Sequence, residues 1–145
     1  MKIVSAVLLA AAAAAAVTAT FLPLSELLIR LAPDQPQTAY VTTGWATHFG
    51  GTKDRHGPLF GVPVAAAAIA LLAGIRWRRT AFAAAAALAG VTGMLFVYLL
   101  NAIGFHEEGN IAIDPGLEAG FGTGTWVLMA ATVLAFGAVV VHPDD

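Results

Sequence analysis

Residues 59–100 read LFGVPVAAAAIALLAGIRWRRTAFAAAAALAGVTGMLFVYLL. This stretch holds two long apolar runs, and the short turn between them carries the dense basic cluster Arg76-Trp77-Arg78-Arg79. A transmembrane helix needs roughly 17 to 25 mostly apolar residues to cross the hydrocarbon core of a bilayer. The stretch therefore predicts two transmembrane helices that are joined by a basic turn.

Two further apolar runs flank this pair. Hydrophobic residues make up 59% of the chain and charged residues 11%, a balance typical of membrane proteins. We predict an all-α membrane protein whose single domain covers residues 1–145. Its four transmembrane helices are expected at about residues 3–22, 59–75, 81–103 and 125–141, and its two extracytoplasmic loops at about 23–58 and 104–124.

The first span has a second interpretation. Its alanine-rich middle and the segment Val17-Thr18-Ala19-Thr20 resemble the hydrophobic region and small-residue site of a cleavable signal peptide. The apolar run continues through Phe21 and Leu22, however, so we expect a retained helix.

The loops also contain local patterns. Residues 24–31, after Pro23, predict a short amphipathic helix. Residues 38–45 are rich in β-branched and aromatic types and favour a short strand or hairpin. Residues 120–124 resemble a phosphate-binding glycine loop only superficially, because no lysine follows, and we expect a flexible hinge there.

Orientation follows from the distribution of basic residues, which favour the cytoplasmic side. The dense cluster at 76–79 directly flanks two spans, and Lys2 precedes the first span. The other basic residues, Arg30, Lys53 and Arg55, are dispersed over a longer loop. We therefore predict a multi-pass protein of the inner (plasma) membrane with both termini in the cytoplasm.

The four spans contain no Asp, Glu, Lys, Arg or His between residues 3–22, 59–75, 81–100 and 125–141. Pumps and ion-coupled transporters usually carry ionisable groups at membrane depth. We therefore expect neither coupled transport nor a tetrapyrrole ligated at mid-membrane, and we expect no cofactor. The net charge of -2 gives no support to a nucleic-acid partner.

The outer loops hold the polar candidates. Three histidines, together with nearby carboxylates, are weak candidates for a zinc or copper site: His48, His56 and His106. Their spacing matches no metal motif, so we favour ion pairs of Lys53 and Arg55 with the loop acids that follow His106.

Aromatic and acidic residues in the same loops are candidates for partner binding: Trp45, Tyr40, Phe49, Glu107 and Glu108. Trp45 has an equally weighted alternative as a core residue of an outer subdomain, since buried tryptophans suit both roles. Trp77 and Trp126 fit the aromatic belts at the two membrane surfaces. The cluster Arg76, Trp77, Arg78 and Arg79 is assigned to topology and to contact with phospholipid headgroups.

With its spans placed, the chain resembles small actinobacterial four-helix membrane proteins whose topology is similar to that of claudins. The features that carry the resemblance are the alanine-rich first span, Trp45 in a long first loop, the basic turn at residues 76–79 and the glycine-rich approach to Trp126. The chain has no cysteine, whereas claudins have a cysteine pair in this loop. The resemblance implies an accessory subunit of a lipid-import or respiratory assembly, with integral-membrane proteins as partners.

The residues themselves favour a non-catalytic accessory subunit, because the helices are rich in small residues that promote close packing. Two other functions stay open. One is a self-associating transporter or channel for an apolar or neutral solute, and the other is an external metal-handling protein. An enzyme is not expected, because no nucleophile and base can be paired from their spacing.

Overall fold

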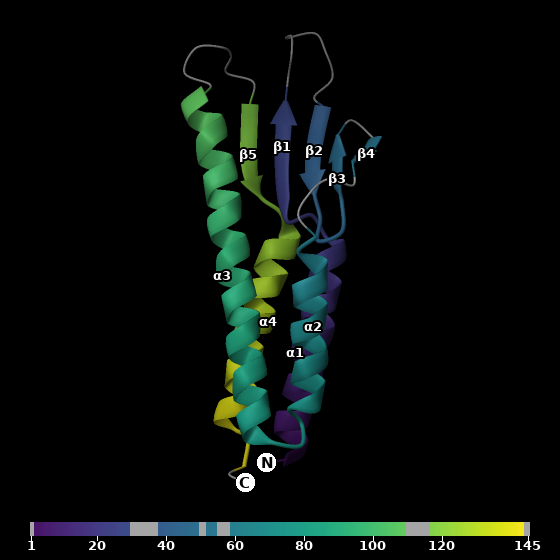
Figure 1. Ribbon diagram of the computed structural model, residues 1–145, viewed down its shortest axis with the longest axis vertical. Coiled ribbons are helices and arrows are strands. Elements are labelled where there is room, and N and C mark those ends of the chain that lie inside the picture. Colours follow the sequence, from purple (N-terminus) through teal and green to yellow (C-terminus); the bar gives the residue numbers. More distant parts are fainter. Residues whose placement is uncertain (1, 30–37, 50–51, 55–58, 110–116, 144–145) are drawn as a thin grey trace.

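The computed structural model describes residues 2–29, 38–49, 52–54, 59–109 and 117–143, which form an elongated molecule with helices at one end and strands at the other (Figure 1). Within these residues the helices are α1 (Lys2–Phe21), α2 (Gly61–Ala73), α3 (Arg78–Gly109) and α4 (Thr123–Val140). The N- and C-termini lie together at the helical end, beside the turn between α2 and α3 (Figure 1).

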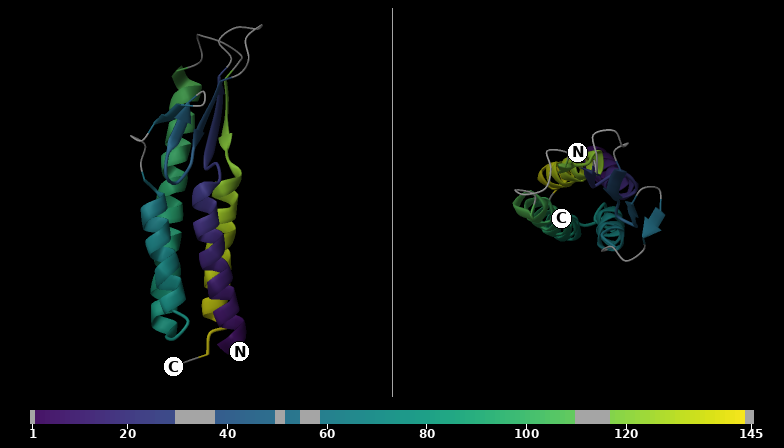
Figure 2. Two further views of the ribbon diagram at one scale, coloured as in Figure 1. Left: turned by 90° about the vertical axis from the view of Figure 1, so that its right-hand side faces the viewer. Right: turned by 90° about the horizontal axis from the view of Figure 1, so that it is seen from above.

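The helices form a ring in which α1 packs against α2, α2 against α3, α3 against α4, and α4 against α1 (Figure 2). The interior is built from small and branched apolar side chains that are fully buried, among them Leu9, Ala12, Ala16, Leu71, Leu88 and Ala135. Short side chains let helix backbones approach closely, which is how helices associate where lipid removes the hydrophobic incentive.

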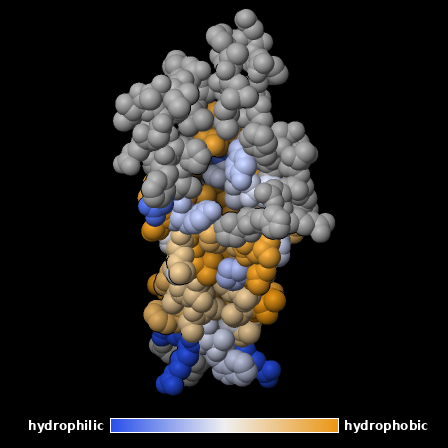
Figure 3. Space-filling model, turned by 45° about the horizontal axis from the view of Figure 1, so that its top comes forward, coloured by the Kyte–Doolittle hydropathy of each residue, from blue (hydrophilic) through white to orange (hydrophobic). Residues whose placement is uncertain are grey.

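The outer surface of the ring is apolar as well. Its exposed large hydrophobic residues include Ile3, Val7, Ile69, Phe82, Met94, Val133 and Val140. Hydrophobic residues cover the visible face of the helical part, and hydrophilic residues gather at its lower end (Figure 3). Such a continuous apolar belt suits contact with lipid rather than with water.

Three helices of the described residues are long and apolar enough to cross a membrane: α1, the part of α3 from Arg78 to Asn101, and α4. The fourth expected span, residues 59–75, is represented by α2, which has only 13 residues. At 1.5 Å per residue α2 is about 20 Å long, whereas the hydrocarbon core is about 30 Å thick. On its own, α2 is too short to cross that core.

The strands form one five-stranded antiparallel sheet in the order β4-β3-β2-β1-β5. They are β1 (Ser25–Ile29), β2 (Thr38–Thr42), β3 (Thr47–Phe49), β4 (Thr52–Asp54) and β5 (Leu117–Phe121). The sheet continues the helices directly, since residues 22–24 alone separate α1 from β1 and Gly122 alone separates β5 from α4.

The structure corrects the secondary structure predicted for residues 24–31 and confirms a strand predicted further along the same loop. The amphipathic helix predicted at residues 24–31 is wrong, because Ser25–Ile29 form β1, which pairs with β2 on one side and β5 on the other. An isolated helix of that length is only marginally stable, whereas a central strand has backbone partners on both edges. The strand predicted within residues 38–45 is confirmed as β2.

The second loop is also shorter than predicted. Residues 104–109 continue α3, and Leu117–Phe121 form β5, so both ends of the predicted loop at 104–124 have regular structure. As a result α3 extends beyond the other helices and runs beside β5 (Figure 1).

Candidate functional site

The turn between β2 and β3 is fixed to the helices by Trp45. The indole nitrogen of Trp45 donates a hydrogen bond to the hydroxyl oxygen of Thr20, 2.8 Å away, and its ring lies 5.9 Å from the ring of Phe21 at the end of α1. Gly61 at the start of α2 lies against the same ring, and a Cβ there would come within 2.5 Å of an indole carbon. Trp45 is half-buried and joins the sheet to two helices.

A second connection lies at the start of α4. The amide of Gly124 donates to the carbonyl of Pro23 over 2.7 Å, and the amide of Gly122 donates to the carbonyl of Leu24 over 2.9 Å. The buried hydroxyl of Thr125 also donates to Leu24, at 2.8 Å. A Cβ on Gly122 would collide with Pro23, so glycine is required by close backbone approach.

The flexible hinge predicted at residues 120–124 is therefore wrong. Gly120 and Phe121 belong to β5, and Gly122 and Gly124 are held against the segment between α1 and β1. Gly122 and Gly124 therefore allow a close backbone contact and do not form a flexible hinge.

Aromatic pairs attach α3 at the same level. Phe96 of α3 stacks on Phe121 of β5 with ring centroids 4.9 Å apart, and Tyr98 contacts Phe60 at 5.2 Å. The stacked pair marks the height at which the helix ring meets the sheet. Beyond Phe96, residues 97–109 continue α3 for about 20 Å at 1.5 Å per residue.

The structure brings some of the predicted partner-binding residues together. Tyr40 and Phe49 occupy directly opposite positions on β2 and β3, and Trp45 lies in the turn that joins these strands. Glu107 and Glu108 lie in the last turn of α3. The side chains of Phe49 and of both glutamates fall outside the description, as do the predicted ion pairs with Lys53 and Arg55.

The weak metal candidates are distributed over different elements. His48 lies on β3, opposite Val41 of β2 and Lys53 of β4, and His106 lies on α3. The side chains of both histidines, and His56 altogether, lie outside the described residues. Within the part that is described, no group of three or more His, Asp or Glu residues could hold a metal ion.

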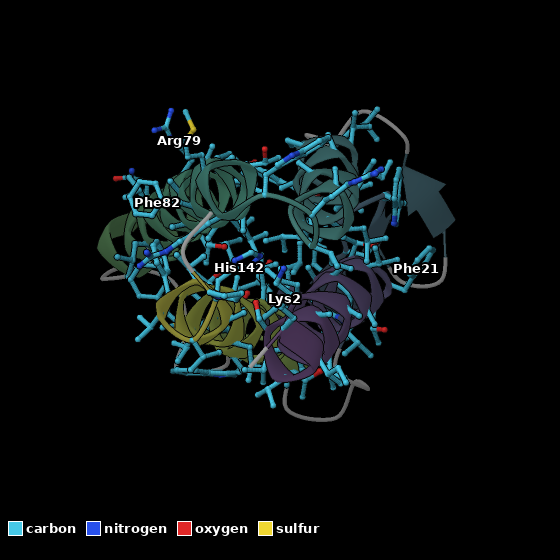
Figure 4. All side chains as sticks on the ribbon, turned by 90° about the horizontal axis from the view of Figure 1, so that it is seen from below. Lys2, Phe21, Arg79, Phe82 and His142 are labelled. Atoms are coloured by element: carbon cyan, nitrogen blue, oxygen red, sulfur yellow. The ribbon has the colours of Figure 1, made fainter. Side chains whose placement is uncertain are left out.

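The basic cluster lies at the opposite end of the molecule. Gly74 at the end of α2 packs against the backbone of Ala81 in α3, where a Cβ would approach to 2.6 Å, so the turn between the helices is tight. The guanidinium of Arg76 lies 5.7 Å from the ring centre of Trp77, which is 55% exposed. Arg79 points outward from α3 (Figure 4).

Trp77 and Trp126 lie near opposite ends of the helix ring. Trp77 precedes α3 at the basic end, and Trp126 lies in the first turn of α4, next to the sheet. Both are more than half exposed. Trp126 also meets Phe121 edge to face at 6.3 Å, so its ring is oriented by the sheet.

Several hydroxyl contacts were not anticipated from the sequence. Thr92 of α3 and Thr132 of α4 share a hydrogen bond of 3.0 Å, and the buried hydroxyl of Ser5 donates to the carbonyl of Ala138 at 3.1 Å. Every buried side-chain nitrogen or oxygen atom in the described residues has a hydrogen-bond partner. Isolated Ser and Thr residues within apolar runs were the available signal, because such hydroxyls commonly bridge helices in membranes.

Comparison with protein-family models and with curated proteins gives no match for this chain. The resemblance to actinobacterial four-helix proteins with claudin-like topology therefore remains a prediction.

Proposed function

We propose that this chain is a non-catalytic accessory or stabilising subunit of a larger inner-membrane complex. In this proposal the helix ring is the anchor in the lipid, both termini face the cytoplasm, and the sheet meets the partner on the extracytoplasmic side. The observation that carries the proposal is the direct attachment of the five-stranded sheet to the ends of three helices through Trp45, Gly122 and Gly124.

The attachments favour binding because they restrict the sheet before a partner arrives. A surface that is already ordered loses less conformational entropy on association than a flexible loop does. β1 follows α1 with only residues 22–24 between them, and β5 leads into α4 through Gly122 alone. Partner contacts made by the sheet would thus be transmitted directly to the membrane helices.

The helix ring supports an anchoring role. Its described interior is filled by side chains such as Leu71, Leu88 and Leu95, which are fully buried. No Asp, Glu, Lys, Arg or His lies within residues 3–21, 61–73, 81–101 or 123–140. A transporter built from this chain would therefore need a solute path between copies. The resemblance described above suggests a lipid-import or respiratory assembly as the class of partner.

Native purification in a mild detergent, followed by mass spectrometry of the intact complex, tests the proposal. A stoichiometric integral-membrane companion is expected. The variant Glu26→Arg reverses an exposed charge on β1, an interior strand of the sheet, and should reduce co-purification. Thr18→Val, an exposed change on α1 whose hydroxyl bonds only within its own helix, is the matched control.

A chain that purifies as a monomer without a companion, under conditions that preserve other membrane complexes, contradicts the accessory role. A homo-oligomer that conducts a neutral solute in proteoliposomes would instead favour the channel.

A further inference from the structure

We propose that the basic end of α3 binds one anionic phospholipid, with its phosphate at Arg76 and Arg79 and one acyl chain along the outward face of α3. The proposal concerns the leaflet at the end where the chain termini lie, and it does not depend on a protein partner.

Arg76 and Arg79 have no acidic partner within the described residues. Arg76 and Arg79 are exposed, and the first turn of α3 contains no acidic residue. None of the described residues at this end is acidic, while Asp144 and Asp145 lie outside the description. The positive end of the α3 dipole adds to the repulsion among the arginines, so an anion bound there is stabilised.

Aromatic residues place this charge at the depth of a lipid headgroup. Trp77 is exposed beside the Arg76 guanidinium, and tryptophan prefers the membrane–water interface. Phe82, 57% exposed, lies one turn along α3 from Arg79. Both Arg79 and Phe82 lie at the outer edge of the ring, whereas Lys2 and His142 lie near its centre (Figure 4).

The surface that continues from Arg79 suits a hydrocarbon chain. Residues at spacings of three and four share one face of a helix, and this series on α3 is Arg79, Phe82, Ala86, Gly90 and Gly93. A Cβ added at Gly90 or Gly93 would meet no atom within 4 Å, so neither glycine is explained by packing within the chain. From Arg79 to Gly90 the helix rises about 16 Å, close to half of the hydrocarbon thickness of about 30 Å.

Charge complementarity selects the occupant. A phosphodiester with a net negative charge matches two exposed arginines, whereas a zwitterionic headgroup brings its own cation to the site. The apolar face formed by Phe82, Ala86, Gly90 and Gly93 binds an acyl chain, and a free phosphate ion has no such chain. We therefore expect phosphatidylglycerol to bind more tightly than phosphatidylcholine.

The test is native mass spectrometry of the full chain in a neutral detergent, titrated separately with phosphatidylglycerol, phosphatidylcholine and inorganic phosphate. One phosphatidylglycerol molecule should be retained preferentially. Replacing either Arg76 or Arg79 by Gln should weaken its binding about fivefold, as expected for one basic residue near a charged surface. Lys2→Gln removes the same charge at the same end, away from the site, and should have less than a twofold effect.

Two glycine variants test whether an acyl chain lies along this face of α3. Gly90→Leu and Gly137→Leu both place a leucine where no atom lies within 4 Å of a Cβ, so both should fold. Only Gly90→Leu should weaken phosphatidylglycerol binding, because Gly137 lies on α4. Circular dichroism and the elution volume in size exclusion check that each variant is folded.

Three results would overturn the proposal. Equal retention of phosphatidylglycerol and phosphatidylcholine would remove the charge selectivity, and displacement by millimolar inorganic phosphate would indicate a site for free anions. Equal effects of the Lys2 and Arg79 variants, or of the two glycine variants, would show that the lipid is not bound on this face of α3.

Discussion

The indole N–H of Trp45 donates to the hydroxyl of Thr20 across 2.8 Å, and this bond joins the turn between β2 and β3 to the last turn of α1. Thr20 is itself buried, and its hydroxyl donates in turn to the carbonyl of Val17 at 2.7 Å. Thr20 therefore links the indole of Trp45 to the backbone of α1. It connects the two parts of the molecule through a chain of polar groups at their boundary.

Trp45→Ala should destabilise the sheet without preventing membrane insertion. Loss of a fully buried tryptophan costs about 3–5 kcal/mol, and the half-buried Trp45 should cost about 2 kcal/mol. Trp45→Phe keeps an aromatic ring but loses the bond to Thr20, so it should cost about 1 kcal/mol. Thermal unfolding in detergent measures the cost, and carbonate extraction reports insertion. Equal stabilities of the parent and Trp45→Ala would contradict this role.

Gly124→Ala should be strongly destabilising, because its Cβ would lie 2.7 Å from the carbonyl oxygen of Ala19. Overpacking of this kind costs about 1–3 kcal/mol. Gly120→Ala, four residues earlier on β5, adds its Cβ where no atom lies within 4 Å and is the matched control. Chemical unfolding of both variants should show a loss at Gly124 alone. A similar loss at both positions would show that backbone conformation, rather than close approach, requires the glycines.

The hydrogen bond between Thr92 and Thr132 should contribute little to the association of α3 and α4. Each hydroxyl also lies within hydrogen-bonding distance of a carbonyl of its own helix, Thr92 at 2.8 Å from Leu88 and Thr132 at 2.9 Å from Leu128. Because a hydroxyl has one proton, the threonine that donates to its partner gives up the bond to its own carbonyl. Such bonds in membrane proteins average about 0.6 kcal/mol. A double-mutant cycle with Thr92→Val and Thr132→Val should give a coupling energy of this size. A coupling above about 2 kcal/mol would mean that the pair has a larger role than a single bond of this class.

The orientation can be tested without removing any native thiol, because the chain has no cysteine. Thr52→Cys on β4 should react with a membrane-impermeant maleimide in intact cells, whereas Asp145→Cys should react only after the membrane is permeabilised. These outcomes follow from the basic residues at the end that holds Lys2 and the 76–79 turn. The reverse labelling pattern would invert the predicted topology.

The long apolar runs were sufficient to predict α1, α3 and α4 as candidate membrane spans, because length and composition are local properties. The helix within residues 59–75 is shorter than predicted. Apolar composition does not determine where each helix ends. The polar residues His106, Glu107 and Glu108 were expected in a loop, yet α3 continues to Gly109. Glutamate is a good helix former and tolerates an exposed helix outside the lipid, so polarity alone did not mark the end of the helix.

The sheet could be predicted only in part. The residues of β2 are rich in β-branched and aromatic types, which favour a strand. β1, in contrast, is a strand because it pairs with β2 and with the distant β5. Partners so far apart in sequence cannot be identified from local pattern. The same limit applies to Trp45, which the sequence leaves open between a partner-binding residue and a core residue. Its bond to Thr20 and its contact with Gly61 depend on the folded chain.

The strand order imposes a sequence of events during synthesis. Strands β1 to β4 precede α2 and can form a meander as soon as they emerge, but β5 follows α3 and is the last strand to be made. The edge of β1 that pairs with β5 is therefore uncovered until α2 and α3 have been made and the chain has returned to the sheet. Completion of the sheet therefore depends on the placement of α2 and α3, and a chain in which these two helices are misplaced cannot bring β5 to β1.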